Sequence, residues 1–172
     1  MPDLIPVLEK DDIKKRVVDV ARRISVDYKD CDPVFVGVLK GAFIFLSDLV
    51  QNLTIPVKIG FVGASSYNSG TSSSRNIRLT KKIEIDLKDK DVLIVEDIVD
   101  TGLTLTYLID YIKSFDPKSV KVCALIDKQE RREAKVKIDY ACQVVREGFL
   151  VGYGLDYAED YRGLPGIYQL KL

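Results

Sequence analysis

The chain has 172 residues, of which 26 are basic and 26 are acidic, so its formal net charge is zero. This length is typical of one domain, and the charge balance provides no general attraction to nucleic acid or anionic lipid. Histidine is absent, which excludes a His-dependent catalytic triad and a His-bound zinc site within the chain. The cysteines are Cys31, Cys123 and Cys142, widely spaced, and we find no secretory or membrane-spanning pattern. We therefore expect a cytoplasmic protein with reduced thiols that binds neither nucleic acid nor membrane.

The first third of the chain predicts a helix, a strand and a second helix. Residues 9–28 carry apolar side chains at helical spacing, and residues 34–39 form a short apolar run typical of a buried strand. Lys40 and Gly41 follow that strand, ahead of a helical pattern from 42 to about 53. An ordinary strand–helix connection also commonly contains glycine. Lys40 favours a functional interpretation, because anions bind beyond the carboxyl ends of parallel strands.

Residues 64–76 form a segment rich in Ser, Gly and Asn between two predicted strands. The flanking residues 57–63 and 77–85 alternate between apolar and polar side chains, which is typical of strands. A loop of this length in a compact domain is usually a functional lid or a disordered segment. We favour a lid because strands frame the segment, and Tyr67 is a candidate ligand contact within it.

The stretch 92–105 is the centre of the pattern. It opens with branched apolar residues, which are typical of a strand buried on both faces. The acidic residues that follow are Glu96, Asp97 and Asp100. A loop of small residues, 101–104, then precedes a helical pattern. This order predicts a ligand site at the end of a buried strand, with the start of a helix available to bind phosphate.

The adjacent carboxylates of this stretch suit the two hydroxyls of a ribose and a magnesium ion with its waters. The loop is neither a Walker A motif nor a dinucleotide fingerprint. A structural role, in which Asp97 or Asp100 only caps the helix, explains one carboxylate but not three. The residues therefore favour a phosphosugar or nucleotide site.

The rest of the chain predicts one more buried strand and a cap. Residues 120–126 form the strand, which ends at Asp127 and Lys128, and residues 129–139 read as a charged, exposed connection. The last third contains short β segments separated by glycines, which suggests a small cap on the main sheet. We predict a three-layer α/β domain with a mostly parallel central sheet.

The central stretch resembles the signature of type I phosphoribosyltransferases, which bind 5-phospho-α-D-ribosyl 1-diphosphate. More narrowly, the chain from about residue 5 onward resembles the hypoxanthine-guanine phosphoribosyltransferases, whose motifs recur here in the family's order. The matching segments are Leu39-Lys40-Gly41 (pyrophosphate loop), Ser66-Tyr67 (opening of a mobile lid), Asp127-Lys128 (purine contact), and 148–157 with Arg162 (hood). The resemblance implies a single domain with a core over about 30–140, a hood from about 1–8 and 141–172, and a lid over about 64–76.

The resemblance also implies roles for the phosphoribosyl site. The 5′-phosphate would bind to Asp100, Thr101, Gly102, Leu103 and Thr104. Glu96 and Asp97 would hold the ribose hydroxyls and a magnesium ion, Mg2+. Pyrophosphate would bind to Lys40, Gly41 and Arg162, and the peptide before Lys40 is cis in the family. Ala42 departs from the family's pattern, which has a second glycine there, and Leu103 stands where a basic residue is common.

For the purine, the resemblance implies that Lys128 donates to the exocyclic oxygen of a 6-oxopurine. Phe149 would stack on the base, and the backbone of Leu150 would contact its edge. Asp156 would border this purine site and hold a second magnesium on the pyrophosphate. Asp100 would be the general acid/base at N7, so the absence of histidine poses no difficulty.

We therefore expect an enzyme that makes IMP or GMP from hypoxanthine or guanine. One alternative is a relative that prefers xanthine, and another is a regulator with the same fold that binds nucleotide or RNA. The neutral charge disfavours an RNA-binding face, and Lys128 disfavours adenine, which has an amino group in place of the oxygen. The family is dimeric or tetrameric, so we expect a homodimer or homotetramer.

Overall fold

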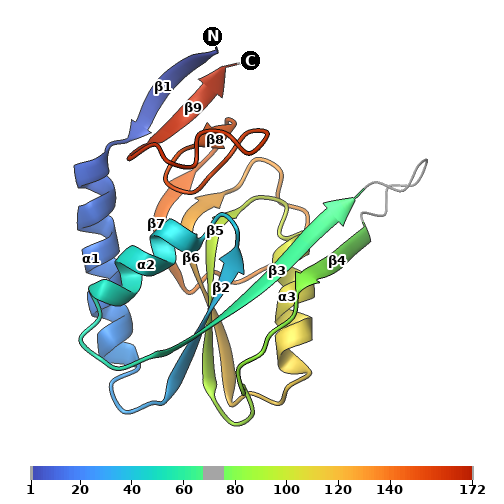
Figure 1. Ribbon diagram of the computed structural model, residues 1–172. Helices are drawn as coiled ribbons and strands as arrows, with labels where there is room; N and C mark the ends of the chain where they lie inside the picture. Colours follow the sequence, from blue (N-terminus) through green and yellow to red (C-terminus); the bar gives the residue numbers. More distant parts are fainter. Residues whose placement is uncertain (1, 68–75, 172) are drawn as a thin grey trace.

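The computed structural model describes residues 2–67 and 76–171, and within them a six-stranded sheet runs through the centre of the molecule (Figure 1). In spatial order its strands are β4 (Asn76–Lys81), β3 (Lys58–Tyr67), β2 (Pro33–Leu39), β5 (Asp91–Val99), β6 (Ser119–Lys128) and β7 (Tyr140–Val145). Neighbouring strands pair in parallel, except β3 with β4. The prediction of a mostly parallel sheet is confirmed.

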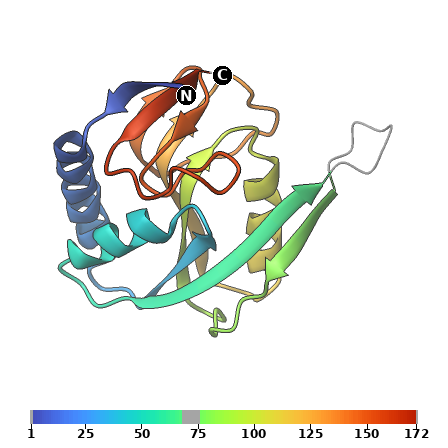
Figure 2. The ribbon, with the colours of Figure 1, turned by 45° about the horizontal axis from the view of Figure 1, so that its top comes forward.

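Helices cover both faces of this sheet (Figure 2). Helices α1 (Lys10–Asp27) and α2 (Phe43–Gln51) lie on one face, and α3 (Leu103–Lys113) lies on the other. Side chains of β5 alternate between them: Leu93 and Val95 pack with α1 and α2, whereas Val92 and Ile94 pack with α3. The three-layer prediction is therefore confirmed. Among the described residues, no helix combines the length and apolar character that crossing a membrane requires.

A second, antiparallel sheet joins the two ends of the chain. Its order is β1 (Asp3–Leu8), β9 (Ile167–Lys171) and β8 (Leu150–Val151). We call residues 152–166, between β8 and β9, the hood loop. Buried residues of the second sheet and the hood loop belong to the same core as α1 and α2; they include Leu8, Leu150, Tyr153, Leu155 and Ile167. The second sheet is thus fixed above the edge where β2, β5 and β6 end (Figure 1).

The structure corrects several predicted boundaries. Strand β7 belongs to the main sheet and not to the hood, because its alternate side chains Tyr140 and Cys142 are buried against α1 and it pairs with β6. Strand β4 ends at Lys81, earlier than predicted. Strands β3 and β4 also extend into the predicted lid, where Ser66 pairs with Ile77. Most of that lid, residues 68–75, lies outside the described residues.

Candidate active site

The carboxyl ends of β2, β5 and β6 bring the predicted site residues to one edge of the sheet. Parallel strands end on the same side, so the segments after them converge. Lys40 follows β2, Asp100 follows β5, and Lys128 is the last residue of β6. Residues separated by about ninety positions along the chain therefore share one site.

Strand β5 extends further than the sequence pattern predicts. It continues to Val99, so Glu96 and Asp97 lie within the strand and not in the loop after it, and Glu96 pairs with Ala124 of β6. The Glu96 side chain is consequently buried, at 7% exposure. Burial, then repulsion from Asp97, raises the pKa of Glu96 well above its usual value, and burial also raises the pKa of Asp97. A cation at this pair would favour its charged form.

Position 41 must be a glycine, because the Asp97 carboxylate lies where a side chain would be. A Cβ at residue 41 would lie 1.7 Å from Asp97 Oδ2, and a Cβ at Gly154 would lie 2.2 Å from the Gly41 carbonyl oxygen. Gly154 also has a left-handed φ of 99°. At Gly41, the segment after β2 therefore approaches the Asp97 carboxylate and the hood-loop backbone so closely that side chains at these glycines would block the contacts. The expected cis peptide is present between Leu39 and Lys40.

The two cations predicted to bind pyrophosphate are both paired with acidic groups. Lys40 Nζ donates to Glu159 Oε2 at 2.8 Å. Arg162 Nη1 donates to the Gly154 carbonyl at 2.7 Å, and its Nη2 lies 3.1 Å from Glu159 Oε1 and 3.2 Å from Asp156 Oδ1. Asp156, predicted beside a second magnesium, thus lies against the Arg162 guanidinium. No sequence motif had singled out Glu159.

The loop 100–104 connects β5 to α3 with a sharp turn. Gly102 has a left-handed φ of 83° and precedes α3, and Thr101 Oγ1 accepts a hydrogen bond from the Leu103 N–H at 3.3 Å. The first-turn N–H groups of α3 and the positive end of its dipole therefore lie at this loop, together with Thr104 in that first turn. The geometry suits an anionic group such as a phosphate.

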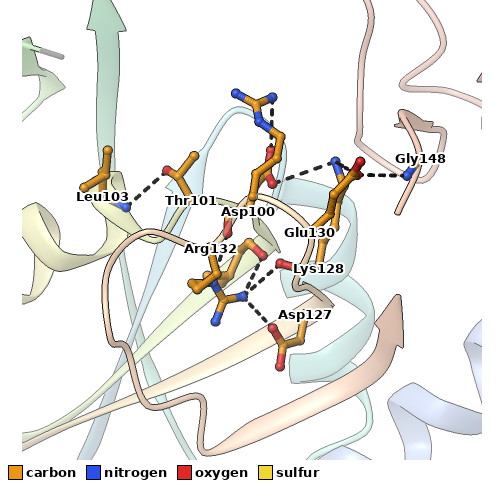
Figure 3. Close-up of polar contacts among 10 residues, drawn as sticks. Asp100, Thr101, Leu103, Asp127, Lys128, Glu130, Arg132 and Gly148 are labelled. Carbon is orange, nitrogen blue, oxygen red and sulfur yellow. Dashed lines mark hydrogen bonds and ion pairs between the residues drawn. The ribbon is translucent and has the colours of Figure 1, made fainter. Parts of the chain in front are cut away.

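Asp100 lies between two cations (Figure 3). Its Oδ1 is 3.8 Å from Lys128 Nζ, and its Oδ2 is 3.6 Å from Arg131 Nη1. Among the described residues, no group hydrogen-bonds to the buried Oδ1. Lys128 is itself buried, at 6% exposure, and its Nζ also lies 3.8 Å from Glu130 Oε2. A buried acceptor and a buried donor thus stand side by side.

Arg132 links the ends of β5 and β6, and the sequence reasoning missed it (Figure 3). It donates to the backbone carbonyls of Val99, Asp100 and Lys128 and to the Asp127 carboxylate, at 2.6–3.0 Å. The segment 129–139 therefore does more than connect strands. The only sequence signal for Arg132 is that arginines follow a strand. The hydrogen-bond partners of such arginines depend on the tertiary structure.

The hood carries the residues that were predicted to contact the purine. Phe149 is 44% exposed, and its ring meets Tyr157 edge-on with centroids 5.6 Å apart. Leu150 is buried in β8. Glu130 connects this segment to Lys128, because its Oε2 also accepts the Gly148 N–H at 3.3 Å. Of the predicted lid residues, Ser66 is an exposed residue of β3, and Tyr67 ends that strand.

Comparison with known proteins agrees with this geometry. Residues 7–158 match the family described as "Phosphoribosyl transferase domain". The hypoxanthine phosphoribosyltransferase of Salmonella typhimurium is 40% identical over 171 residues, which cover 98% of this chain and 94% of that protein. The hypoxanthine-guanine phosphoribosyltransferase of Bacillus subtilis is 39% identical over 165 residues, covering 96% and 92%.

Solved structures give the same result. A hypoxanthine phosphoribosyltransferase from Staphylococcus aureus has a TM-score of 0.92 and 37% identity, over 96% of this chain and 90% of that chain. The chain therefore belongs to the phosphoribosyltransferase family. Its fold is the type I phosphoribosyltransferase fold, as the central stretch predicted.

Proposed function

We propose that the protein is a purine salvage enzyme that transfers the 5-phosphoribosyl group from 5-phospho-α-D-ribosyl 1-diphosphate to N9 of hypoxanthine or guanine. The products are IMP or GMP and pyrophosphate. The observation that carries the proposal is the juxtaposition of the Asp100 carboxylate and the Lys128 ammonium, 3.8 Å apart, beside the phosphate-binding loop. The names of the relatives described above support it.

The Asp100–Lys128 pair matches one edge of a 6-oxopurine. The exocyclic oxygen and N7 of such a base are neighbours, so one donor and one acceptor side by side can engage both. Lys128 donates to the oxygen, and Asp100 Oδ1, to which no described group hydrogen-bonds, accepts the N7 proton as N9 attacks the ribose. A buried donor that loses its acceptor is costly, which disfavours adenine.

The remaining side chains bind different parts of the other substrate, the ribosyl diphosphate. The loop 100–104 and the start of α3 hold the 5′-phosphate, while Glu96 and Asp97 face the ribose hydroxyls. Lys40 and Arg162 neutralise the charge that develops on the departing pyrophosphate. Phe149 stacks on the base, and the Leu150 backbone borders its edge.

The donor set at Glu96 and Asp97 fits magnesium. Within the described residues no group of three or more acidic, cysteine or histidine side chains converges on one point. Two adjacent carboxylates suffice, however, because magnesium usually keeps several waters and takes further oxygens from substrate phosphates. When bound, the ion would supply positive charge that stabilises the leaving group. Asp156, proposed to hold a second magnesium on the pyrophosphate, lies 3.2 Å from Arg162 Nη2 through its Oδ1.

The proposal is tested by steady-state kinetics with hypoxanthine, guanine and xanthine, each with the ribosyl diphosphate and magnesium. We expect nucleotide from hypoxanthine or guanine, and a strong preference for xanthine would favour the alternative relative. Failure of all three bases, with turnover of a pyrimidine, would refute the purine assignment.

The acid/base role is tested by Asp100→Asn. This variant keeps the size of the side chain but removes the proton acceptor and the charge that faces Lys128 and Arg131. We expect kcat to fall by about 100-fold or more, with a much smaller change in binding of the ribosyl diphosphate. Wild-type kcat in this variant would refute the role.

We also propose that the enzyme works in the cytoplasm as a homodimer or homotetramer. Light scattering during size-exclusion chromatography would then give two or four times the chain mass of 19.4 kDa. A mass of one chain at micromolar concentration would contradict the expected assembly.

A further inference from the structure

Glu159 bridges the two cations that face the leaving group. One carboxylate oxygen, Oε2, accepts from Lys40 Nζ at 2.8 Å, and the other, Oε1, lies 3.1 Å from Arg162 Nη2. Lys40 belongs to the segment after β2, and Arg162 belongs to the hood loop. A single acidic side chain thus makes the two contacts that a pyrophosphate would make with the same groups.

The hood loop presents this carboxylate through a tight turn. Tyr157 and Asp160 exchange backbone hydrogen bonds of 3.1 and 3.0 Å, and between them Ala158 and Glu159 have left-handed φ values of 51° and 70°. Such a turn favours Asn or Gly at both central positions. The Glu159 N–H donates to Asp156 Oδ2 at 2.9 Å, which further fixes the turn beside Arg162. The backbone of this turn therefore directs the Glu159 side chain.

The contacts of Glu159 with Lys40 and Arg162 can also be broken easily. The side chains of Lys40 and Glu159 are 67% and 64% exposed. Exposed ion pairs stabilise proteins little, so an anion of higher charge can displace the carboxylate from Lys40 at small cost. The same anion would take over the contact with Arg162, whose side chain is 19% exposed. Hydrogen bonds from Lys40 and then Arg162 lower the pKa of Glu159 from its ordinary value.

We propose that Glu159 is a resident counterion of the leaving-group site. It holds Lys40 and Arg162 in the empty enzyme, it is displaced when a diphosphate binds, and it returns to assist the release of pyrophosphate. This role rests on the proposed function, because it assigns Lys40 and Arg162 to the leaving group. Glu159 is a positioning residue that acts through these two cations and touches no reacting atom.

The test compares Glu159→Gln with the wild type. The amide keeps the shape of the side chain but removes the charge that competes with pyrophosphate. We expect the Kd of inorganic pyrophosphate, measured by calorimetry, and the KM of the ribosyl diphosphate to fall by about three- to tenfold. The KM of hypoxanthine and the midpoint of urea unfolding should not change.

A matched control is Glu84→Gln, which removes an exposed glutamate paired with Lys81 at 3.3 Å, away from this site. It should leave both constants unchanged. An active enzyme in which Glu159→Gln binds pyrophosphate as the wild type does, or more weakly, overturns the counterion role alone. A wild type that neither binds pyrophosphate nor makes IMP overturns the proposed function and the counterion role with it.

Discussion

Replacing Arg132 by methionine removes a side chain that joins the ends of β5 and β6. Its guanidinium donates to three backbone carbonyls and to the Asp127 carboxylate. A hydrogen bond to a charged group contributes roughly 1.5–3 kcal/mol, and such contributions are not additive within one cluster. The variant also leaves Asp127, whose side chain is only 15% exposed, without its cation. We expect the free energy of unfolding to fall by about 3 kcal/mol.

The same substitution should slow catalysis, because two of the freed carbonyls belong to Asp100 and Lys128. A displacement of about 1 Å in such groups can cost roughly 100-fold, and we expect a fall in kcat of this size. Urea unfolding and initial rates of IMP formation measure the two effects. The control is Arg22→Met, since Arg22 is an exposed arginine of α1 paired with Asp19. Wild-type stability and kcat in Arg132→Met would refute the inferred link.

Two further predictions concern a close backbone contact and a buried thiol. Gly41→Ala places a methyl group 1.7 Å from Asp97 Oδ2, so the carboxylate must turn away. The KM of the ribosyl diphosphate should then rise by about tenfold or more with little change in the unfolding midpoint, and an unchanged KM would contradict the steric argument. Burial raises the pKa of Cys142 from 9.0 to about 12. The resulting stabilisation of the folded state is fully present below pH 9 and is lost as the pH rises toward 12. Between these pH values the Cys142 thiol ionises in the unfolded chain but not in the folded protein. Between pH 8 and pH 10, wild-type unfolding free energy should fall by about 1.4 kcal/mol more than that of Cys142→Ala, measured by urea unfolding. Parallel pH profiles of the two proteins would contradict it.

Periodicity was sufficient to predict the layers, and strand-end chemistry indicated where a site would lie, whereas the purine and hood residues were predicted from the family resemblance. Apolar runs identified β2, β5 and β6, because strands covered on both faces are continuously apolar. Lys40, Asp100 and Lys128 could be assigned to one edge because parallel strands end together. These inferences use local sequence and one general rule of α/β topology.

The errors and omissions arise where distant segments decide the outcome. Glu96 and Asp97 interrupt the apolar run, so the pattern ended β5 early, although pairing with β6 continues the strand. The membership of β7 in the main sheet likewise depends on its pairing with β6. Arg132 and Glu159 looked like ordinary surface charges, because their partners come from other parts of the fold.

The pairing of β1 with β9 makes assembly of the site depend on the order of synthesis. Asp3 lies opposite Lys171, so β1 leaves the ribosome long before its partner strand exists. All six strands of the main sheet lie between these two segments in the chain. The second sheet, which borders the hood loop with Arg162, can therefore form only after the strands of the main sheet have been made. Pairing across so much of the sequence raises the contact order of the fold, which correlates with slower folding.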